Sequence, residues 1–208
     1  CINLGFYACN FSEEVGGAGL NHLDFALVER ELGRGSMALT HFFGRPQNIL
    51  MACKDEQIEN YLLPAVRGEK MDALAMTEPD AGSDVRGMKC FAKRDGTDWI
   101  VNGTKHFISG AEHADFVIVF IATGEEKTEK GPKKKITAFL VDRGTQGFTI
   151  RDGYNSVSHK GYKNMILEFD DCRLPKEQIL GEIDGGFAVM NTWLYATRLT
   201  VAAMSVGR

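Results

Sequence analysis

Eight short runs with the pattern of β-strands follow one another between residues 72 and 169, and they constrain the fold more than any other feature of the chain. Their lengths and the spacing of the turns between them are typical of an antiparallel sandwich or barrel. The runs are Asp72–Met76, Met88–Arg94, Asp98–Val101, Thr104–Ser109, Phe116–Thr123, Ile136–Asp142, Phe148–Arg151 and Met165–Phe169. Asn102-Gly103 predicts a type I′ hairpin between two of them, whereas the charged residues 124–135 predict a loop.

Helical patterns precede this β-region. Asn21 is a predicted helix N-cap, and Gly35 is the predicted end of that helix. A second helix is expected over residues 48–54. A third helix follows, which Pro64 breaks or restarts and Gly68 ends.

Another helical pattern follows the β-region. After Gly185-Gly186 the spacing of apolar residues by three and four is typical of one face of a bundle helix. These residues are Phe187, Met190, Leu194, Thr197, Val201 and Met204. We therefore predict an α+β fold with an N-terminal helical domain (1–71), a middle antiparallel β-barrel or β-sandwich domain (72–183) and the start of a C-terminal helical bundle (184–208).

Composition and charge exclude several classes of protein. The net charge of -4 provides no basic surface for nucleic acid or for an anionic membrane. The longest apolar run, Phe116–Thr123, is too short to span a bilayer. The five cysteines show neither a CxxC pair nor metal-ligand spacing, so we expect reduced, mostly buried thiols and no bound metal. No GxGxxG or P-loop pattern supports a Rossmann or nucleoside-triphosphate site.

The two ends of the chain are unusual. It begins with Cys1, shows no signal-peptide pattern, and stops inside a predicted helix that has no cap. We expect an internal piece of a longer protein, located in the cytoplasm of a bacterium or in the mitochondrial matrix of a eukaryote.

One turn has the residue types of a ligand site. An apolar run, Ala73 to Met76, is followed by Thr-Glu-Pro-Asp-Ala-Gly-Ser-Asp at residues 77–84, in which Pro79 fixes φ and Gly82 permits a conformation that other residues resist. A strand that ends in exposed amides and short hydroxyls can approach a planar or anionic ligand closely. On spacing alone, a capped turn with no ligand is the more common structure.

Side-chain alternation in the run Thr104–Ser109 provides a second candidate. Phe107 and Ser109 are predicted to share one face with Lys105, whereas His106 faces away and is interpreted as structural. An aromatic ring and a hydroxyl on one face could cover a flat ring system. A core Phe beside an ordinary hairpin Ser explains the same pair.

These motifs resemble those of one family, the FAD-dependent acyl-CoA dehydrogenases. Residues 77–84 resemble the family's flavin-wall motif, and Lys-His-Phe-Ile-Ser-Gly at 105–110 resembles its second flavin segment. Residues 167–175 with 179–181 resemble the exit from its middle domain, and residues 12–20 resemble a further family segment. Four motifs in the family's order imply its fold, without most of the C-terminal helical domain.

The resemblance implies a set of site residues. Phe107 stands where the family's usual Trp lies against the isoalloxazine ring, and Ser109 stands where its usual Thr lies near flavin N5. The implied cofactor-binding residues are Met76, Thr77, Gly82, Ser83, Phe107, Ile108 and Ser109. Ser83 and Arg198 are the implied substrate-binding residues.

The implied reaction is α,β-dehydrogenation of an acyl-CoA thioester. A carboxylate removes the α-proton while the β-hydride moves to flavin N5, and the base needs a raised pKa. One family position for this Glu corresponds to Thr197, directly before Arg198, and a hydroxyl cannot replace a carboxylate. We therefore assign no catalytic residue within the chain and expect the base beyond Arg208, so that the isolated fragment is inactive.

The implied partners are acyl-CoA, an electron-transferring flavoprotein, and further copies of the chain in a homodimer or homotetramer, with no nucleic acid and no membrane. Lys133–Lys135 could meet CoA phosphates, although a solvated loop is more common for such a run.

Two alternative functions stay open. One is an acyl-CoA oxidase or flavin monooxygenase of the same fold, and the other is a non-catalytic ligand-binding module.

Overall fold

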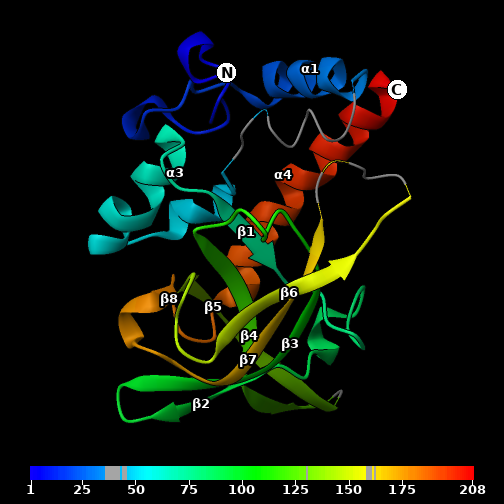
Figure 1. The fold of residues 1–208 in the computed structure, drawn as a ribbon. Coiled ribbons are helices and arrows are strands. Elements are labelled where there is room, and N and C mark those ends of the chain that lie inside the picture. The colour runs from blue at the N-terminus through cyan, green and yellow to red at the C-terminus, as the bar shows by residue number, and fades with distance from the viewer. Residues whose placement is uncertain (36–42, 44–45, 130, 158–160, 162) are drawn as a thin grey trace. The chain divides into compact units, whose positions relative to one another are not determined.

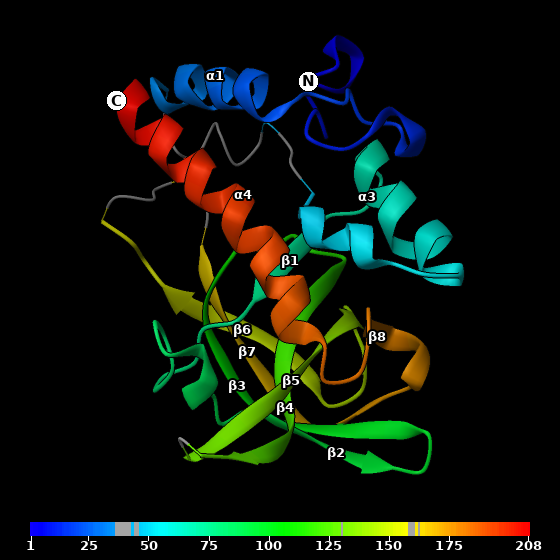
Figure 2. The same ribbon diagram turned by 180° about the vertical axis from the view of Figure 1, so that it is seen from behind.

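A computed structural model of the chain describes residues 1–35, 43, 46–129, 131–157, 161 and 163–208. They form two compact units (Figures 1 and 2). The β unit comprises Asp72–Ser156 and Tyr162–Val189. The helical unit comprises Cys1–Met71, Val157–Gly161 and Met190–Arg208.

One sheet of eight strands makes up most of the β unit (Figure 1). The strands are β1 (Asp72–Ala75), β2 (Phe91–Asp95), β3 (Asp98–Ser109), β4 (Phe116–Thr128), β5 (Gly131–Asp142), β6 (Phe148–Tyr154), β7 (Asn164–Leu174) and β8 (Ile179–Leu180). Their order is β6-β7-β3-β2-β4-β5-β8, and β1 lies beside β4. The predicted α+β fold is confirmed, with a curled sheet that is mixed because β1 and β2 run parallel to β4.

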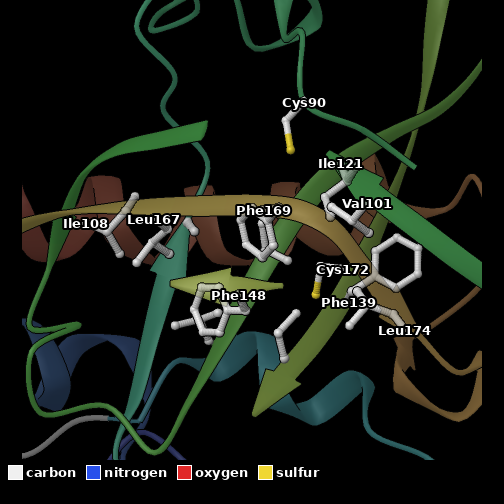
Figure 3. Packing of buried hydrophobic residues seen from close by; sticks show 14 of the residues in the cluster. Cys90, Val101, Ile108, Ile121, Phe139, Phe148, Leu167, Phe169, Cys172 and Leu174 are labelled. Carbon is white, nitrogen blue, oxygen red and sulfur yellow. The ribbon is translucent and has the colours of Figure 1, made fainter. Parts of the chain in front are cut away.

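The core of the β unit lies inside the curl of the sheet (Figure 3). Alternate residues of β3, β4, β5 and β7 point into it, as the period of two in a half-buried strand requires. The rings of Phe148 and Phe169 stack with centroids 5.0 Å apart, and Trp99 meets Phe139 edge to face. Short helical turns η5 (Val85–Gly87) and η6 (Lys176–Gln178) connect strands.

The predicted hairpin at Asn102-Gly103 is wrong, because both residues lie inside β3. The chain turns earlier, at Gly96, so that β2 and β3 pair along their length up to Asn102. The pairing of β3 with β7 shifts between Val101 and Gly103, which marks a bulge. A Cβ at Gly103 would lie 2.7 Å from the Cα of Cys90, so the glycine permits a close approach of two backbones.

The predicted loop at residues 124–135 is also wrong where the structure describes it. Strands β4 and β5 continue as a two-stranded ribbon to the pair Thr128↔Gly131, and only Lys130 lies outside the described residues. Glu125 stands opposite Lys134, and Glu126 stands opposite Lys133. Opposite charges at facing strand positions are compatible with an extended ribbon, so a charged run does not by itself indicate a loop.

The helical unit contains η1 (Ile2–Leu4), η2 (Glu13–Val15), α1 (His22–Gly33), η3 (Asn48–Ala52), η4 (Ile58–Leu62) and α3 (Leu63–Arg67), together with most of α4 (Gly186–Gly207). The predicted cap of α1 is confirmed, since the Asn21 side chain accepts hydrogen bonds from the N–H groups of Leu23 and Asp24. The helix ends two residues before Gly35. The helix expected over residues 48–54 is the shorter 3₁₀ helix η3.

Pro64 restarts the third helical segment as predicted. The π-helix η4 precedes it, and Pro64 lies in the first turn of the α-helix α3. Proline has no N–H to donate to the carbonyl of Asn60, four residues earlier. Lys70 Nζ donates to that carbonyl at 2.9 Å, which satisfies it. Gly68 ends the helix at φ 72, the left-handed conformation that suits glycine.

Helices α1 and α4 approach each other closely within the helical unit (Figure 2). A Cβ at Gly33 would lie 2.2 Å from the carbonyl oxygen of Met204, and one at Gly207 would lie 1.9 Å from that of Arg30. The predicted apolar stripe of α4 is buried at Met190 and Met204 and exposed at Val201. No helix among the described residues is long and apolar enough to cross a membrane.

The cysteines are free thiols, and all but Cys1 are buried, as predicted. Burial raises the pKa of Cys53 and of Cys90 to about 12, and that of Cys172 to about 11. A thiol with such a pKa stays protonated at neutral pH and is a poor nucleophile.

Candidate functional site

A buried ion pair joins the turn after β1 to strand β3. Lys105 Nζ lies 2.7 Å from Glu78 Oε1, and the two side chains are 0% and 3% exposed. Lys105 also donates to the carbonyl oxygen of Met76 at 3.1 Å. The Glu78 carboxylate accepts further hydrogen bonds from the N–H groups of Lys89 and Cys90. Each charge therefore has several partners, which a buried pair needs to offset its desolvation.

A backbone hydrogen bond reinforces this connection. His106 N–H donates to the carbonyl oxygen of Thr77 at 2.8 Å. On the exposed side of the turn, Lys89 Nζ lies 2.6 Å from Asp80 Oδ2. Their hydrogen bond lowers the pKa of Asp80 and raises the pKa of Lys89. These bonds hold residues 76–78 against residues 105–109 of β3. We call these two segments together the wall.

The prediction that Lys105 shares a face with Phe107 is wrong, because a bulge interrupts the alternation. The pairing of β3 with β7 shifts between Lys105 and Ile108, so His106 and Phe107 together oppose a single residue. Phe107 has φ 58, a left-handed conformation that is rare for a bulky residue. Lys105 and Ile108 are buried, whereas Phe107 and Ser109 are both exposed.

The interpretation of His106 as a residue that faces away from Phe107 is also wrong. Its Nδ1 lies 2.7 Å from the hydroxyl of Tyr154, and the Tyr154 ring stacks on Phe107 with centroids 4.4 Å apart. Sequence reasoning missed Tyr154 altogether. It lies on β6, two strands away from β3, and no local pattern connects the two.

The other predicted residues lie in the turn after β1 or in β3 beside Phe107. Met76 and Thr77 are half-buried at the end of β1, and Ser109 Oγ lies 2.9 Å from Asn164 Oδ1. The Ile108 side chain is buried in the core, so only its backbone can contact a ligand on the exposed face. Gly82 and Ser83 are exposed in the turn.

The reason given for Gly82 is wrong. Its φ is not in the left-handed region, and a Cβ there would meet no atom within 4 Å. The structure gives no steric reason for this glycine. Thr197 is half-buried and Arg198 is exposed, and both lie on the part of α4 that belongs to the helical unit.

The loop after Ser83 is held by contacts with β5 and with the start of α4. The Arg86 guanidinium donates to the carbonyl oxygen of Lys134 and lies 4.1 Å from the centre of the Phe187 ring. Lys134 Nζ donates to the carbonyl oxygen of Met88, and Lys135 pairs with Asp184 at 3.0 Å. Two of the three lysines considered for CoA phosphates thus have internal partners.

Comparison with known proteins identifies the class to which this fold and wall belong. The family model for the acyl-CoA dehydrogenase N-terminal domain matches residues 1–69, and the model for the acyl-CoA dehydrogenase middle domain matches residues 73–172. The chain belongs to the acyl-CoA dehydrogenase family.

The similar proteins include some that are named dehydrogenases and some that are named for a reductase. The chain is 34% identical to the mitochondrial short-chain specific acyl-CoA dehydrogenase of Homo sapiens, over 98% of this chain and 50% of the relative. It is 34% identical to a 3-(aryl)acrylate reductase of Clostridium sporogenes, over 98% and 54%. It is 32% identical to subunit CarC of the caffeyl-CoA reductase-Etf complex of Acetobacterium woodii, also over 98% and 54%. The chain thus spans about half the length of these relatives.

Solved structures agree with this assignment. Butyryl-CoA dehydrogenase from Megasphaera elsdenii matches with a TM-score of 0.85 and 31% identity, over 99% of this chain and 55% of that one. A glutaryl-CoA dehydrogenase from Mycobacterium smegmatis in complex with FADH2 matches with a TM-score of 0.85 and 28% identity, over 99% and 52%.

Proposed function

We propose that the complete protein containing this chain is an FAD-dependent acyl-CoA dehydrogenase that passes electrons to an electron-transferring flavoprotein. Membership of the family supports the reaction class, and the Etf-complex subunit among the relatives supports the partner. The observation that carries the proposal is the wall: an exposed Phe107 ring beside Ser109, held by the buried Lys105–Glu78 pair.

The residues of the wall fit a flat, partly polar ring system. Phe107 is 55% exposed although it is a large apolar side chain, and its backbone is held in a rare conformation. Backbone strain at a residue other than glycine is common at ligand sites. We propose that Phe107 packs against the flavin ring, that Thr77 and Ser109 bond its polar edge, and that the backbone of Met76 and Ile108 contacts it.

When bound, the flavin would supply two-electron oxidation of the Cα–Cβ bond of the thioester. The protein must then polarise the thioester carbonyl and provide a base for the α-proton. We propose that Gly82 and Ser83 lie where cofactor and thioester meet and that Arg198 contributes to substrate binding. Thr197 cannot act as the base. We propose that the base is a carboxylate in a part of the complete protein that corresponds to the half of the relatives not covered by this chain.

This proposal includes the domain organisation. Residues 1–71, 72–183 and 184–208 would be the N-terminal helical domain, the middle β-domain and the start of the C-terminal helical domain. The complete protein would assemble as a homodimer or homotetramer.

Reduction is a second candidate direction, which the names of two relatives support. These two carry the word reductase in their names, at 34% and 32% identity. The same wall would serve the reverse reaction, in which an α,β-unsaturated thioester accepts the electrons. The direction then depends on the reduction potentials of the flavin and of its electron-transfer partner.

The test is to purify the complete protein and determine its cofactor and its reaction. We expect a yellow protein that releases FAD on denaturation and oxidises butyryl-CoA or isovaleryl-CoA with an electron-transferring flavoprotein as acceptor. Crotonyl-CoA with the reduced electron-transferring flavoprotein as electron donor tests the reverse direction. Rapid turnover with oxygen alone would favour an oxidase, and a protein without flavin would contradict the proposal.

A further inference from the structure

Tyr154 and His106 support the Phe107 ring from one side, a role that the proposed function does not include. Tyr154 ends β6, Phe107 lies in β3, and β7 runs between these strands. Because neighbouring strands lie about 4.8 Å apart, β3 and β6 are separated by roughly twice that distance. The two rings nevertheless stack, with centroids 4.4 Å apart and planes inclined by 24°.

Two bulges bring these rings together across β7. On β3 the register shifts between Lys105 and Ile108, and on β6 it shifts between Arg151 and Tyr154. Both strands pair there with the same stretch of β7, residues 164–167. A bulge inserts a residue and re-aims the side chains beside it. The coincidence of two bulges at one level of the sheet explains how strands that are not neighbours contribute to one aromatic group.

Gly153 allows the bulge on β6. A Cβ at this position would lie 2.0 Å from the carbonyl oxygen of Asn164, which no side chain can tolerate. The glycine therefore lets β6 press against β7 immediately before Tyr154. A side chain at residue 153 would push the two strands apart at the level of Tyr154.

The Tyr154 side chain is held at both ends. Its ring stacks on Phe107, and its hydroxyl lies 2.7 Å from Nδ1 of His106. The backbone N–H of His106 is bonded in turn to Thr77 in the wall. Phe107 and Tyr154 are still 55% and 38% exposed, so the stack does not close over the Phe107 ring.

We propose that Tyr154 is a positioning residue for flavin binding, and that the His106 hydrogen bond orients it. Stacking on one side of Phe107 holds the ring in place before the cofactor arrives, so that binding costs less side-chain freedom. This inference rests on the proposed function, in which Phe107 contacts the flavin. Tyr154 itself acts through Phe107.

The experiment measures FAD binding to the apo form of the complete protein, by titration with FAD and flavin fluorescence. Tyr154→Ala removes the stack, and we expect FAD to bind about fivefold more weakly, the size of one lost aromatic pair. Tyr154→Phe keeps the stack and loses the hydroxyl, so about a twofold loss is expected. Phe91→Ala is the matched control, because Phe91 is 49% exposed on β2 and makes no part of the wall.

The outcomes separate this inference from the proposed function. A wild-type protein that does not bind FAD overturns both. A wild type that binds FAD while Tyr154→Ala binds it equally well overturns the inference alone, as does an equal loss in Phe91→Ala. His106→Leu leaves the stack in place and is expected to match Tyr154→Phe, so it tests the hydrogen bond even where Tyr154→Ala does not fold. The KM for acyl-CoA is expected to stay unchanged in all four variants.

Discussion

Strand β3 contains two bulges a few residues apart, and they are built differently. At the first, the backbone departs from regular pairing at Gly103, where the Cα of Cys90 leaves no room for a side chain. At the second, the residue with the unusual backbone is Phe107, at φ 58. The first bulge packs against buried neighbours, whereas the second presents an exposed ring.

The residue at each bulge distinguishes a bulge that serves packing from a bulge at the candidate site. Glycine adopts a positive φ without strain, so the first bulge serves the packing of β3 against its neighbours. A bulky residue in the left-handed region costs about 1–2 kcal/mol. That cost persists only where surrounding contacts enforce the conformation, which is common at functional sites. The buried Lys105–Glu78 pair stands directly before the second bulge and supplies such a contact.

Breaking the ion pair tests whether it enforces the second bulge. Lys105→Met leaves the Glu78 carboxylate buried without its cation, so we expect the free energy of unfolding to fall by about 3–5 kcal/mol. Chemical denaturation measures it. Lys163→Met is the control, because its ion pair with Asp152 has a similar N–O distance, 2.8 Å, but is exposed and is expected to matter little. The double variant Lys105→Met/Glu78→Gln should regain part of the loss, and no recovery would argue against an unpaired charge as the cause.

Adding one methyl group tests the first bulge. Gly103→Ala places a Cβ 2.7 Å from the Cα of Cys90 at φ 138, so we expect a loss of about 2–3 kcal/mol in unfolding free energy. Gly96→Ala is the control, since a Cβ there meets no atom within 4 Å and only the positive φ contributes. Equal losses in the two variants would show that the contact with Cys90 is unimportant.

Removing the hydrogen bonds between Asn102, which lies in the first bulge, and Asp171 on β7 should have a smaller effect on stability. The Asn102 side chain donates to the Asp171 carboxylate and accepts from the Asp171 N–H, both at 3.0 Å. Asn102→Ala removes both bonds at an exposed position, so we expect thermal denaturation to report a loss of about 1 kcal/mol. An unchanged melting temperature in Asn102→Ala would show that these two hydrogen bonds contribute nothing to stability.

Replacing the ring at the second bulge should change stability least and binding most. Asparagine tolerates the left-handed region, so in Phe107→Asn the relief of backbone strain offsets the lost stack with Tyr154, and we expect unfolding free energy to change by less than about 1 kcal/mol. FAD binding to the complete protein should weaken about tenfold or more. A variant with lower stability and unchanged FAD affinity would make Phe107 a structural residue.

Raising the pH should leave the first bulge unaffected over the neutral range. The pKa of Cys90 is raised by burial from its ordinary value of 9.0 to about 12, so its contribution to stability is complete below about pH 9 and is lost as the pH rises toward 12. Iodoacetamide at pH 8 is expected to modify the exposed Cys1 and spare Cys90, as mass spectrometry of digested protein would show. Modification of Cys90 in the folded protein would mean that this region opens.

Much of the fold followed from local patterns. The Asn21 cap and the Gly68 helix end depend on a few adjacent residues, and both were predictable. The bulge at Asn102-Gly103 was not predictable. An Asn-Gly pair suits a hairpin as well as a bulge, and only the pairing of β3 with β7 distinguishes the two. The ribbon at 124–135 depends on which charges face each other across two strands, which a single strand does not reveal.

At the candidate site, the types of residue were predictable from the sequence, but the directions in which their side chains point were not. The motifs at residues 77–84 and 105–110 identify the family, and side-chain alternation placed Phe107 and Ser109 on one face. A bulge shifts alternation by one residue, which turned Lys105 into the core and brought His106 beside Phe107.

The amino-acid sequence by itself therefore determined that helical segments flank a β-region, the family, and the two segments that form the wall, because these depend on neighbours along the chain. The tertiary structure alone decided that Glu78 pairs with Lys105 and that Tyr154 stacks on Phe107. Such contacts depend on strand register across a sheet, where residues far apart in the chain meet and one inserted residue reverses the face on which a side chain lies.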